Sequence, residues 1–330
     1  MSGSRSRPSP AERAVAALQT AREDPASAAS REKIRAALAA PLALVAVKAA
    51  RIIAENELDG FGPDLEAAFR RFLATPANPD PSCQAKIALL EALDRTESLD
   101  PDPFLLAIRC VQPEAAWGPP VDTAGRVRAR GILALARLAH HDFGVLAAEL
   151  LADPDAIVRQ TVAEAIEARG DRANAGLLRF KLSVGDEEAA VTLACLAALL
   201  TLAPQAALPL AKQYLAGPET QAELAGVALG QSGRDDALDM LVEFLRTAAL
   251  PSQRALALRW LGYHRSERAL GHLLAIIAEA PRKEAAAAVT VLGARSFESG
   301  LRARVEEAAG RNERADLVAV IREAFAAESS

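Results

Sequence analysis

The sequence predicts an all-α chain folded as a right-handed α-solenoid of stacked antiparallel helical hairpins. Residues 122–185 hold two copies of one unit, and these superimpose so that Val127 falls on Val158 and Arg128 on Arg159. Apolar residues make up 51% of the chain but aromatic residues only 4%, and β-branched runs are short, so strands have little local support. An Ala-rich composition of this kind suits helices that approach one another closely along a stack.

The same unit recurs towards the C-terminus at nearly constant spacing. From the second copy onwards, successive starts differ by 32, 32, 33 and 30 residues, and they are Pro154, Asp186, Pro218, Pro251 and Pro281. Each copy is expected to contain two helices of about 14 residues joined by a short turn. The turns that end the first helices are marked by Gly170, Gly233, Gly262 or Gly293. Regular repeats are therefore expected over residues 119–310.

The parts of the chain outside these repeats are less regular. Residues 1–9 are expected to form a flexible tail, and residues 311–330 a C-terminal capping helix centred on 312–327. Residues 10–118 are expected to form degenerate repeats and a cap, with helices over 10–23, 30–39, 42–58, 81–95 and 103–110 and a first turn at Pro41. The Pro- and Gly-rich segment around Trp117 predicts a loop whose indole plugs a gap in the stack or, less favourably, projects outward.

Charge and cysteine usage exclude several classes of protein. The net charge of −5 divides evenly, −2 over residues 1–118 and −3 beyond, which disfavours a nucleic-acid surface. Three separated cysteines without a CxxC spacing support neither a disulfide framework nor a structural zinc site. No apolar run reaches the roughly 18 residues of a membrane span. A soluble, cytoplasmic protein is therefore expected.

One short pattern in the repeat resembles a known superfamily. The pattern is D-x-x-V-R-x-x-A-x-x-A-[LI], and it is represented here by Asp155, Val158, Arg159, Val162, Ala165 and Ile166. It resembles the HEAT repeats, most closely the short bacterial HEAT-like type also found in phycobilisome lyases. The resemblance implies a solenoid over about residues 120–310 and implies little about function, because this scaffold hosts unrelated roles.

Motifs that carry defined chemistry are absent from the sequence. There is no GxxxxGK[ST], GxGxxG or GxSxG. His140 and His141 are adjacent and, on a helix, would point about 100° apart, and neither His264 nor His272 belongs to an HExxH pair. The absence of His–Glu pairs speaks against an iron enzyme such as the HEAT-repeat deoxyhypusine hydroxylase. The sequence therefore predicts a non-enzymatic chain with no catalytic, cofactor-binding or metal-binding residue.

Several charged and aromatic residues have both a structural and a binding interpretation. Buried ion pairs within or between repeats are favoured for Arg128 and Arg159. Arg126, Arg130 and Arg137 share one side of a helix, opposite its apolar stripe, and form either a solvated basic stripe or a site for an acidic partner. Trp260 and Tyr263 gather aromatic rings in one repeat, which indicates helix-end packing or a recognition spot.

The favoured function is a protein-interaction scaffold or adaptor that holds a protein or peptide on a concave face formed by the second helices. Candidate contact residues on those helices are Arg172, Arg179, Lys181, Lys212, Gln213, Asp239, Glu243, Arg246, Arg268, His272, Glu279 and Arg302. One alternative is a subunit of a bilin-lyase-like complex that attaches a chromophore. Another is a HEAT-like DNA-repair protein, which the even charge balance disfavours. The oligomeric state stays open.

Overall fold

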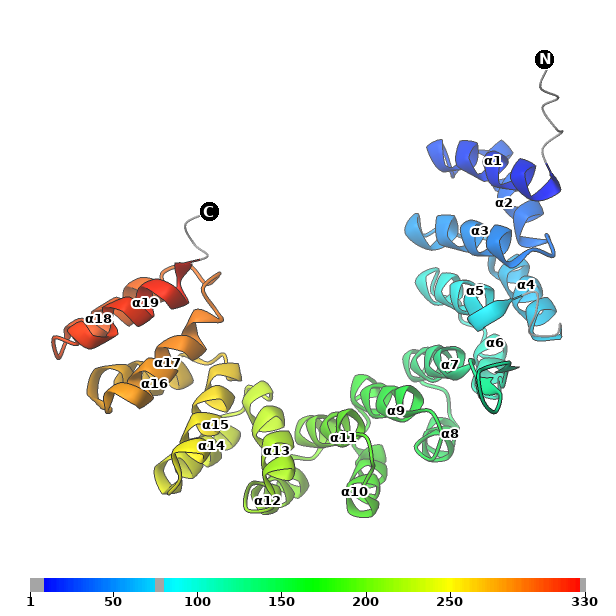
Figure 1. Ribbon diagram of the computed structural model, residues 1–330. Coiled ribbons are helices and arrows are strands. Elements are labelled where there is room, and N and C mark those ends of the chain that lie inside the picture. Colours follow the sequence, from blue (N-terminus) through cyan, green and yellow to red (C-terminus); the bar gives the residue numbers. More distant parts are fainter. Residues whose placement is uncertain (1–8, 75–79, 327–330) are drawn as a thin grey trace. The chain divides into compact units, whose positions relative to one another are not determined.

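The computed structural model describes residues 9–74 and 80–326 of the chain. Over these residues the regular structure is helical apart from one pair of two-residue strands, which confirms the predicted all-α solenoid. The chain divides into two compact units, Met1–Gly170 and Asp171–Ser330, and each unit is a stack of helical hairpins (Figure 1). The tail expected at residues 1–9 lies outside the described residues except for Ser9.

Local signals place the first helices of unit 1 close to their predicted positions. Helix α1 begins in a capping box, in which Ser9 and Glu12 each satisfy a backbone N–H of the other, with Pro10 in the first turn. Helix α3 begins after Leu42, so Pro41 lies before the helix and not within it. The helices of this unit are α1 (Pro10–Glu23), α2 (Ala28–Leu38), α3 (Ala43–Glu55), α4 (Gly62–Ala74), α5 (Gln84–Arg95), α6 (Asp102–Ala107), α7 (Gly125–Arg137), α8 (Phe143–Leu150) and α9 (Ala156–Arg169).

A short hairpin interrupts unit 1 where the loop was expected. Strand β1 (Pro113–Glu114) pairs antiparallel with β2 (Val121–Asp122). The Glu114 carboxylate accepts hydrogen bonds from the Ser82 backbone N–H at 2.6 Å and from the Thr123 hydroxyl at 2.8 Å. These bonds hold the base of the hairpin against the start of α5, while Trp117 beyond the strands is fully exposed. The favoured expectation that Trp117 plugs a gap is therefore wrong, because the strands direct their connecting segment into solvent.

Unit 2 consists of the predicted two-helix repeats. Its first helices are α11 (Ala189–Leu202), α13 (Glu219–Gln231), α15 (Pro251–Tyr263) and α17 (Arg282–Gly293), and its second helices are α10 (Ala175–Val184), α12 (Pro204–Leu215), α14 (Asp235–Thr247), α16 (Glu267–Glu279) and α18 (Leu301–Gly310). The C-terminal segment departs from the single helix expected over 312–327. Glu313 has a positive φ of 51°, and a 3₁₀ turn (Ala315–Leu317) precedes the shorter α19 (Val318–Ala324).

The four predicted turn glycines fall into two groups. Gly170 and Gly233 adopt φ values of 71° and 66° just after first helices, as the turns require. Gly262 and Gly293 instead are the last but one residue of α15 and the last residue of α17, where a Cβ would approach Val291 Cγ1 to 2.1 Å and Ala324 Cβ to 2.7 Å. These two positions need glycine for the close approach of neighbouring helices, so their assignment to turns is wrong.

The two helical layers of unit 2 are packed unequally. Helices α11, α13, α15 and α17 each pack against the next, whereas α12, α14 and α16 make few contacts with one another and only α16 and α18 pack closely in the second layer. A stack curves towards its more closely packed layer, so the first helices form the inner side of this unit, as Figure 1 shows. The expectation that second helices line the concave side is therefore wrong. Their wider spacing leaves grooves between them.

A buried arginine joins neighbouring repeats in unit 1. The Arg128 guanidinium, 4% exposed, donates from Nε and Nη2 to the two oxygens of Asp153 at 2.7 and 2.9 Å. Its Nη1 donates to Asp122 Oδ2 at 2.6 Å and to the Cys110 carbonyl oxygen at 2.8 Å. Arg159 likewise donates to the backbone carbonyl of Asp153 at 2.8 Å. Both arginines are therefore structural, as favoured from the sequence.

Candidate functional site

A groove of about 560 Å³ lies between the second helices α12 and α14. Leu215, Met240 and Phe244 give it an apolar floor, while Lys212 and Glu243 stand on its rim. Phe244 is half-buried because its ring packs against that of Trp260, with 5.3 Å between ring centroids. The groove therefore combines an apolar base with exposed charges of both signs at its edge.

A second groove of about 560 Å³ lies on the other side of α14, against α16. Its apolar lining includes Leu245 and Ile276, and its charged lining includes Arg246 and Glu279. Its base is braced by an ion pair in which Arg254 Nε and Nη2 each lie 2.7 Å from an oxygen of Glu284. Hydrogen bonding from Arg254 holds the pKa of the Glu284 carboxyl below its ordinary value.

Helix α14 is the ridge between these two grooves. It buries Leu238, Leu241 and Leu245 towards the inner layer. Glu243 and Arg246 lie at its exposed side and pair through two hydrogen bonds of 2.8 and 2.7 Å. Both side chains are more than half exposed, so a partner can replace this pair at little cost. The ridge thus offers a charge of each sign between two apolar depressions.

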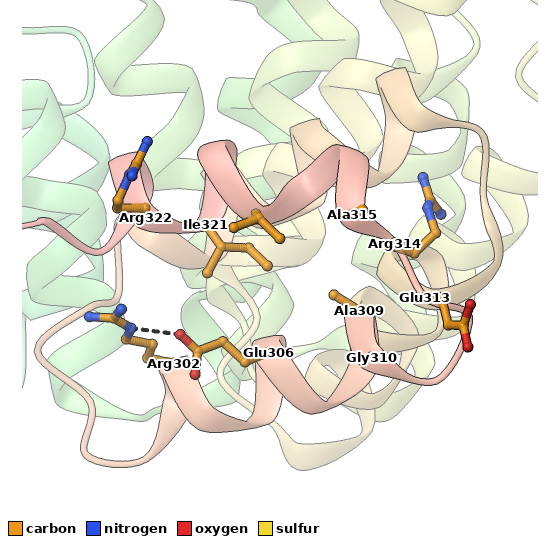
Figure 2. Close-up of a pocket in the computed structure, with 10 residues that line it drawn as sticks. Arg302, Glu306, Ala309, Gly310, Glu313, Arg314, Ala315, Ile321 and Arg322 are labelled. Atoms are coloured by element: carbon orange, nitrogen blue, oxygen red, sulfur yellow. Dashed lines mark hydrogen bonds and ion pairs between the residues drawn. The ribbon is translucent and has the colours of Figure 1, made fainter.

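A third groove, of about 570 Å³, opens between α18 and α19 at the C-terminal end (Figure 2). Ala309 and Ile321 line its floor, and Arg302 and Arg322 lie at the same end of it. Arg302 Nε donates to Glu306 Oε1 at 2.9 Å. At the opposite end, Arg314 donates to the carbonyl oxygens of Ile277, Ala278 and Ala280, which end α16. Arg314 therefore caps α16 and has a structural role. Arg302 is the one lining residue of this groove that the sequence analysis named as a candidate partner contact.

The structure distributes the predicted second-helix residues unevenly. Lys212 and Glu243 meet in the α12–α14 groove, and Arg246, His272 and Glu279 in the α14–α16 groove. Asp239 and Arg268 are hydrogen-bonded to each other across α14 and α16. Lys181 forms a 2.8 Å ion pair with the largely buried Asp186, so it has a structural role. The remaining three are exposed and line none of these grooves: Arg172, Arg179 and Gln213.

The predicted aromatic spot is divided between core and surface. Trp260 is fully buried and donates from Nε1 to Glu223 at 3.0 Å, so its assignment to a recognition surface is wrong. The reason is its position on the side of α15 that faces α13, where Gly226 leaves room for the indole. Tyr263 is 39% exposed in the inner layer, away from the second-helix grooves.

The predicted basic stripe of unit 1 is mostly neutralised by the preceding repeat. Arg137 Nε donates to Asp94 of α5 at 2.7 Å, and Arg130 lies 3.8 Å from Glu91 of the same helix. Arg126 is exposed at the start of α7. Two of the three arginines therefore join helices together, and the charge available to an acidic partner is smaller than the sequence indicates.

The adjacent histidines lie in a turn, whereas the sequence analysis placed them on a helix. His140 and His141 occupy the turn between α7 and α8, where their rings stack with centroids 4.5 Å apart. Their nitrogens and an Asp142 oxygen lie within 4.8 Å of one another. However, His140 Nδ1 accepts a hydrogen bond from the Asp142 N–H at 3.2 Å, and stacked rings direct their lone pairs alongside each other. We assign no metal site to this turn.

The apolar floors of the grooves escaped the sequence reasoning. Met240 and Phe244 lie four residues apart on α14, beside its buried stripe of leucines. A sequence signal for these floors exists, because the apolar side of α14 is wider than packing against a single neighbouring helix requires.

Among the described residues, no helix has the length and hydropathy needed to traverse a bilayer.

Comparison with known proteins adds to this geometry. No protein-family model matches the chain, and no curated protein matches it. Among solved structures it is similar to the complex of CpcE and CpcF of phycocyanin lyase from a Nostoc species. That match has 18% identity and a TM-score of 0.37, and it covers 85% of this chain and 94% of the other. The helical hairpins described above form an all-α repeat fold.

The expectation of a non-enzymatic chain does not stand. It was drawn from absent motifs, whereas the similar solved structure is by its printed name that of a phycocyanin lyase. The missing phosphate-binding and hydrolase motifs exclude only the chemistries that need them. A repeat scaffold can take part in catalysis as a subunit without carrying such a motif itself.

Proposed function

We propose that the chain is a protein-binding helical repeat that holds a segment of a partner protein across α14. The observation that carries this proposal is the pair of 560 Å³ grooves flanking one ridge, each with an apolar floor and a charged rim. Apolar centres surrounded by polar, hydrated edges are the usual anatomy of protein interfaces. Each groove has the volume of a pocket for a few anchoring side chains.

The two kinds of contact have different roles in this interface. Apolar anchors of the partner fill the depressions beside Met240 and Phe244 and supply most of the free energy of binding, because they remove apolar surface from water. The Glu243–Arg246 pair lies between the anchors and selects the charge pattern of the partner. A partner segment with one acidic and one basic residue between two apolar anchors fits this order.

Two variants of the full chain test the proposal. A partner is first isolated by affinity purification with the full chain, and its affinity is then measured by isothermal titration calorimetry. Met240→Lys places a charge in the α12–α14 groove and is expected to weaken binding by roughly tenfold or more. Val184→Lys, at an exposed apolar residue outside the grooves, is the matched control and is expected to bind normally.

The second variant exchanges the two charges on the α14 ridge. Glu243→Arg combined with Arg246→Glu keeps the net charge and exchanges the two signs, so a partner selected by charge order is bound less tightly. Circular dichroism confirms that each variant is folded. If the purified partner binds the groove variant and the ridge variant as tightly as the unaltered chain, this surface is not its site and the proposal fails.

A second candidate function is a subunit of a chromophore-attaching lyase complex. It is motivated by the repeat pattern that ends at Ile166 and by the phycocyanin-lyase complex among the similar structures. It shares the protein-binding role, because that neighbour is a complex of two proteins. Co-expression with a phycobiliprotein, a bilin and the candidate partner subunit tests it, with absorbance of the purified phycobiliprotein as readout. Covalent bilin that depends on this chain supports the candidate, and equal attachment without the chain excludes it.

A further inference from the structure

An open pocket of about 470 Å³ lies in the inner layer of unit 2, between α15 and α17. Three arginines line it, together with a phenol and a hydroxyl: Arg259, Arg265, Arg295, Tyr263 and Thr290. Arg259 and Tyr263 come from α15, while Arg265 and Arg295 follow the ends of α15 and α17. The close approach of these two helices at Gly262 brings the four side chains to one place.

Carboxylates neutralise this pocket only in part. Arg259 Nη2 lies 2.6 Å from Glu223 Oε2, an oxygen that also accepts the Trp260 indole N–H. Arg295 forms two hydrogen bonds to Glu298, of 2.9 and 2.8 Å, and Arg265 lies 3.6 Å from the same carboxylate. Three guanidinium groups therefore share two carboxylates, which leaves an excess of one positive charge around the pocket.

The most buried of these arginines has an unused donor. The Arg295 side chain is 9% exposed, and its Nη1 has no hydrogen-bond partner among the described residues. A buried nitrogen without an acceptor costs free energy, because it has lost its hydrogen bonds to water. Arg265 also has N–H groups free to bind a ligand, since its contact with the Glu298 carboxylate is long. Its other contact is with the ring of Phe297, whose centroid lies 5.8 Å away, and this contact uses no N–H hydrogen bond.

We propose that this pocket binds an oxyanion, either a carboxylate or a phosphate. Guanidinium groups match both anions in geometry and form charge-assisted hydrogen bonds to them. The oxyanion offers acceptors to the exposed Arg265 guanidinium and compensates the excess charge, and the Tyr263 hydroxyl donates from the rim. The site lies in the inner layer, away from the second-helix grooves, so it goes beyond the proposed function and stands or fails independently of it.

Binding of small anions to the purified full chain tests the proposal. Inorganic phosphate is titrated in one arm and succinate in another, at constant ionic strength maintained with chloride, by isothermal titration calorimetry. Arg265→Gln is expected to weaken binding about tenfold or more, as loss of a hydrogen bond to a charged group predicts. Tyr263→Phe removes only a hydroxyl and is expected to weaken binding by a smaller factor. Arg172→Gln removes an exposed charge of the same sign outside the pocket and is the matched control.

Each outcome decides the question. Saturable binding of either anion that Arg265→Gln weakens and Arg172→Gln preserves supports the site, and the arm that saturates identifies the source as phosphate or carboxylate. Neither anion saturating, or equal affinity in all three variants, overturns it. None of the three variants replaces the largely buried Arg295, and melting curves check that all three are folded.

Discussion

Trp260 lies so close to Gly226 that the two residues fix the spacing of α13 and α15. A Cβ on Gly226 would stand 2.0 Å from the indole Cδ2, well inside any allowed contact. The indole is fully buried, and its Nε1 reaches Glu223 of α13. The indole of Trp260 therefore occupies the space left by the missing side chain of Gly226, and α13 and α15 pack closely at this point.

Gly226→Ala is expected to destabilise the chain. The added methyl group clashes with a ring that cannot move away, and overpacking of this kind costs about 1–3 kcal/mol. Gly271→Ala is the control, because a Cβ at that exposed position of α16 meets no atom within 4 Å. It is expected to stabilise the helix by about 0.5–1 kcal/mol. Urea unfolding followed by circular dichroism measures both, and equal stability of the two variants would contradict the packing described.

The two tryptophans of the chain are expected to behave oppositely. Trp260→Ala removes a fully buried ring and should lower the free energy of unfolding by about 3–5 kcal/mol. Trp117→Ala removes a fully exposed ring and should change it by less than about 0.5 kcal/mol. Acrylamide should quench the fluorescence of the Trp260→Ala chain readily and that of the Trp117→Ala chain poorly. Strong protection of Trp117 from the quencher would restore the plug interpretation.

Arg128→Ala is expected to be among the most damaging substitutions in unit 1. It leaves the Asp153 carboxylate, whose side chain is 7% exposed, without its two guanidinium hydrogen bonds. Removal of one partner from a buried ion pair costs about 3–5 kcal/mol. Arg246→Ala breaks the exposed pair with Glu243 and should cost at most about 1 kcal/mol. A smaller loss in Arg128→Ala than in Arg246→Ala, measured by chemical unfolding, would refute a structural role for Arg128.

Stability should fall in acid. Hydrogen bonding from Arg254 lowers the pKa of Glu284, and hydrogen bonding from Arg295 lowers the pKa of Glu298, each below the ordinary value of 4.5. A carboxyl whose pKa is depressed by folding contributes stability fully above its unfolded pKa, and this is lost as the pH falls through the folded pKa. The free energy of unfolding should therefore decrease below about pH 4.5, and Glu284→Gln should flatten that decrease. An unchanged pH profile in Glu284→Gln would contradict the prediction.

The Cys195 thiol is expected to be inert in the folded chain. Burial raises its pKa to about 12, so thiolate is scarce at pH 8 and reagents cannot reach the sulfur. Iodoacetamide should leave the peptide that contains Cys195 unmodified in buffer and label it in concentrated urea, as measured by mass spectrometry. Equal labelling rates in the two conditions would show that α11 opens under native conditions.

Local sequence was sufficient for the helical repeats. The spacing of Pro218, Pro251 and Pro281 predicted where hairpins begin, because proline fits a helix start and each hairpin buries the same stripe. Gly170 and Gly233 were correctly assigned to turns, because a positive φ is a local requirement. Charged residues such as Lys212 and Arg246 were placed correctly on second helices by the same periodicity.

Contacts between repeats were decided only by the tertiary structure. One-dimensional periodicity shows which side of a helix is apolar, but it does not show which layer packs more closely, so it could not reveal that the first helices form the inner side. For the same reason it did not separate Gly262, which admits a neighbouring helix, from a turn glycine, or the buried Trp260 from the exposed Trp117. The grooves beside Met240 and the arginine pocket near Tyr263 arise from the distance between helices about 30 residues apart in sequence, which depends on the volumes of side chains that meet only after folding.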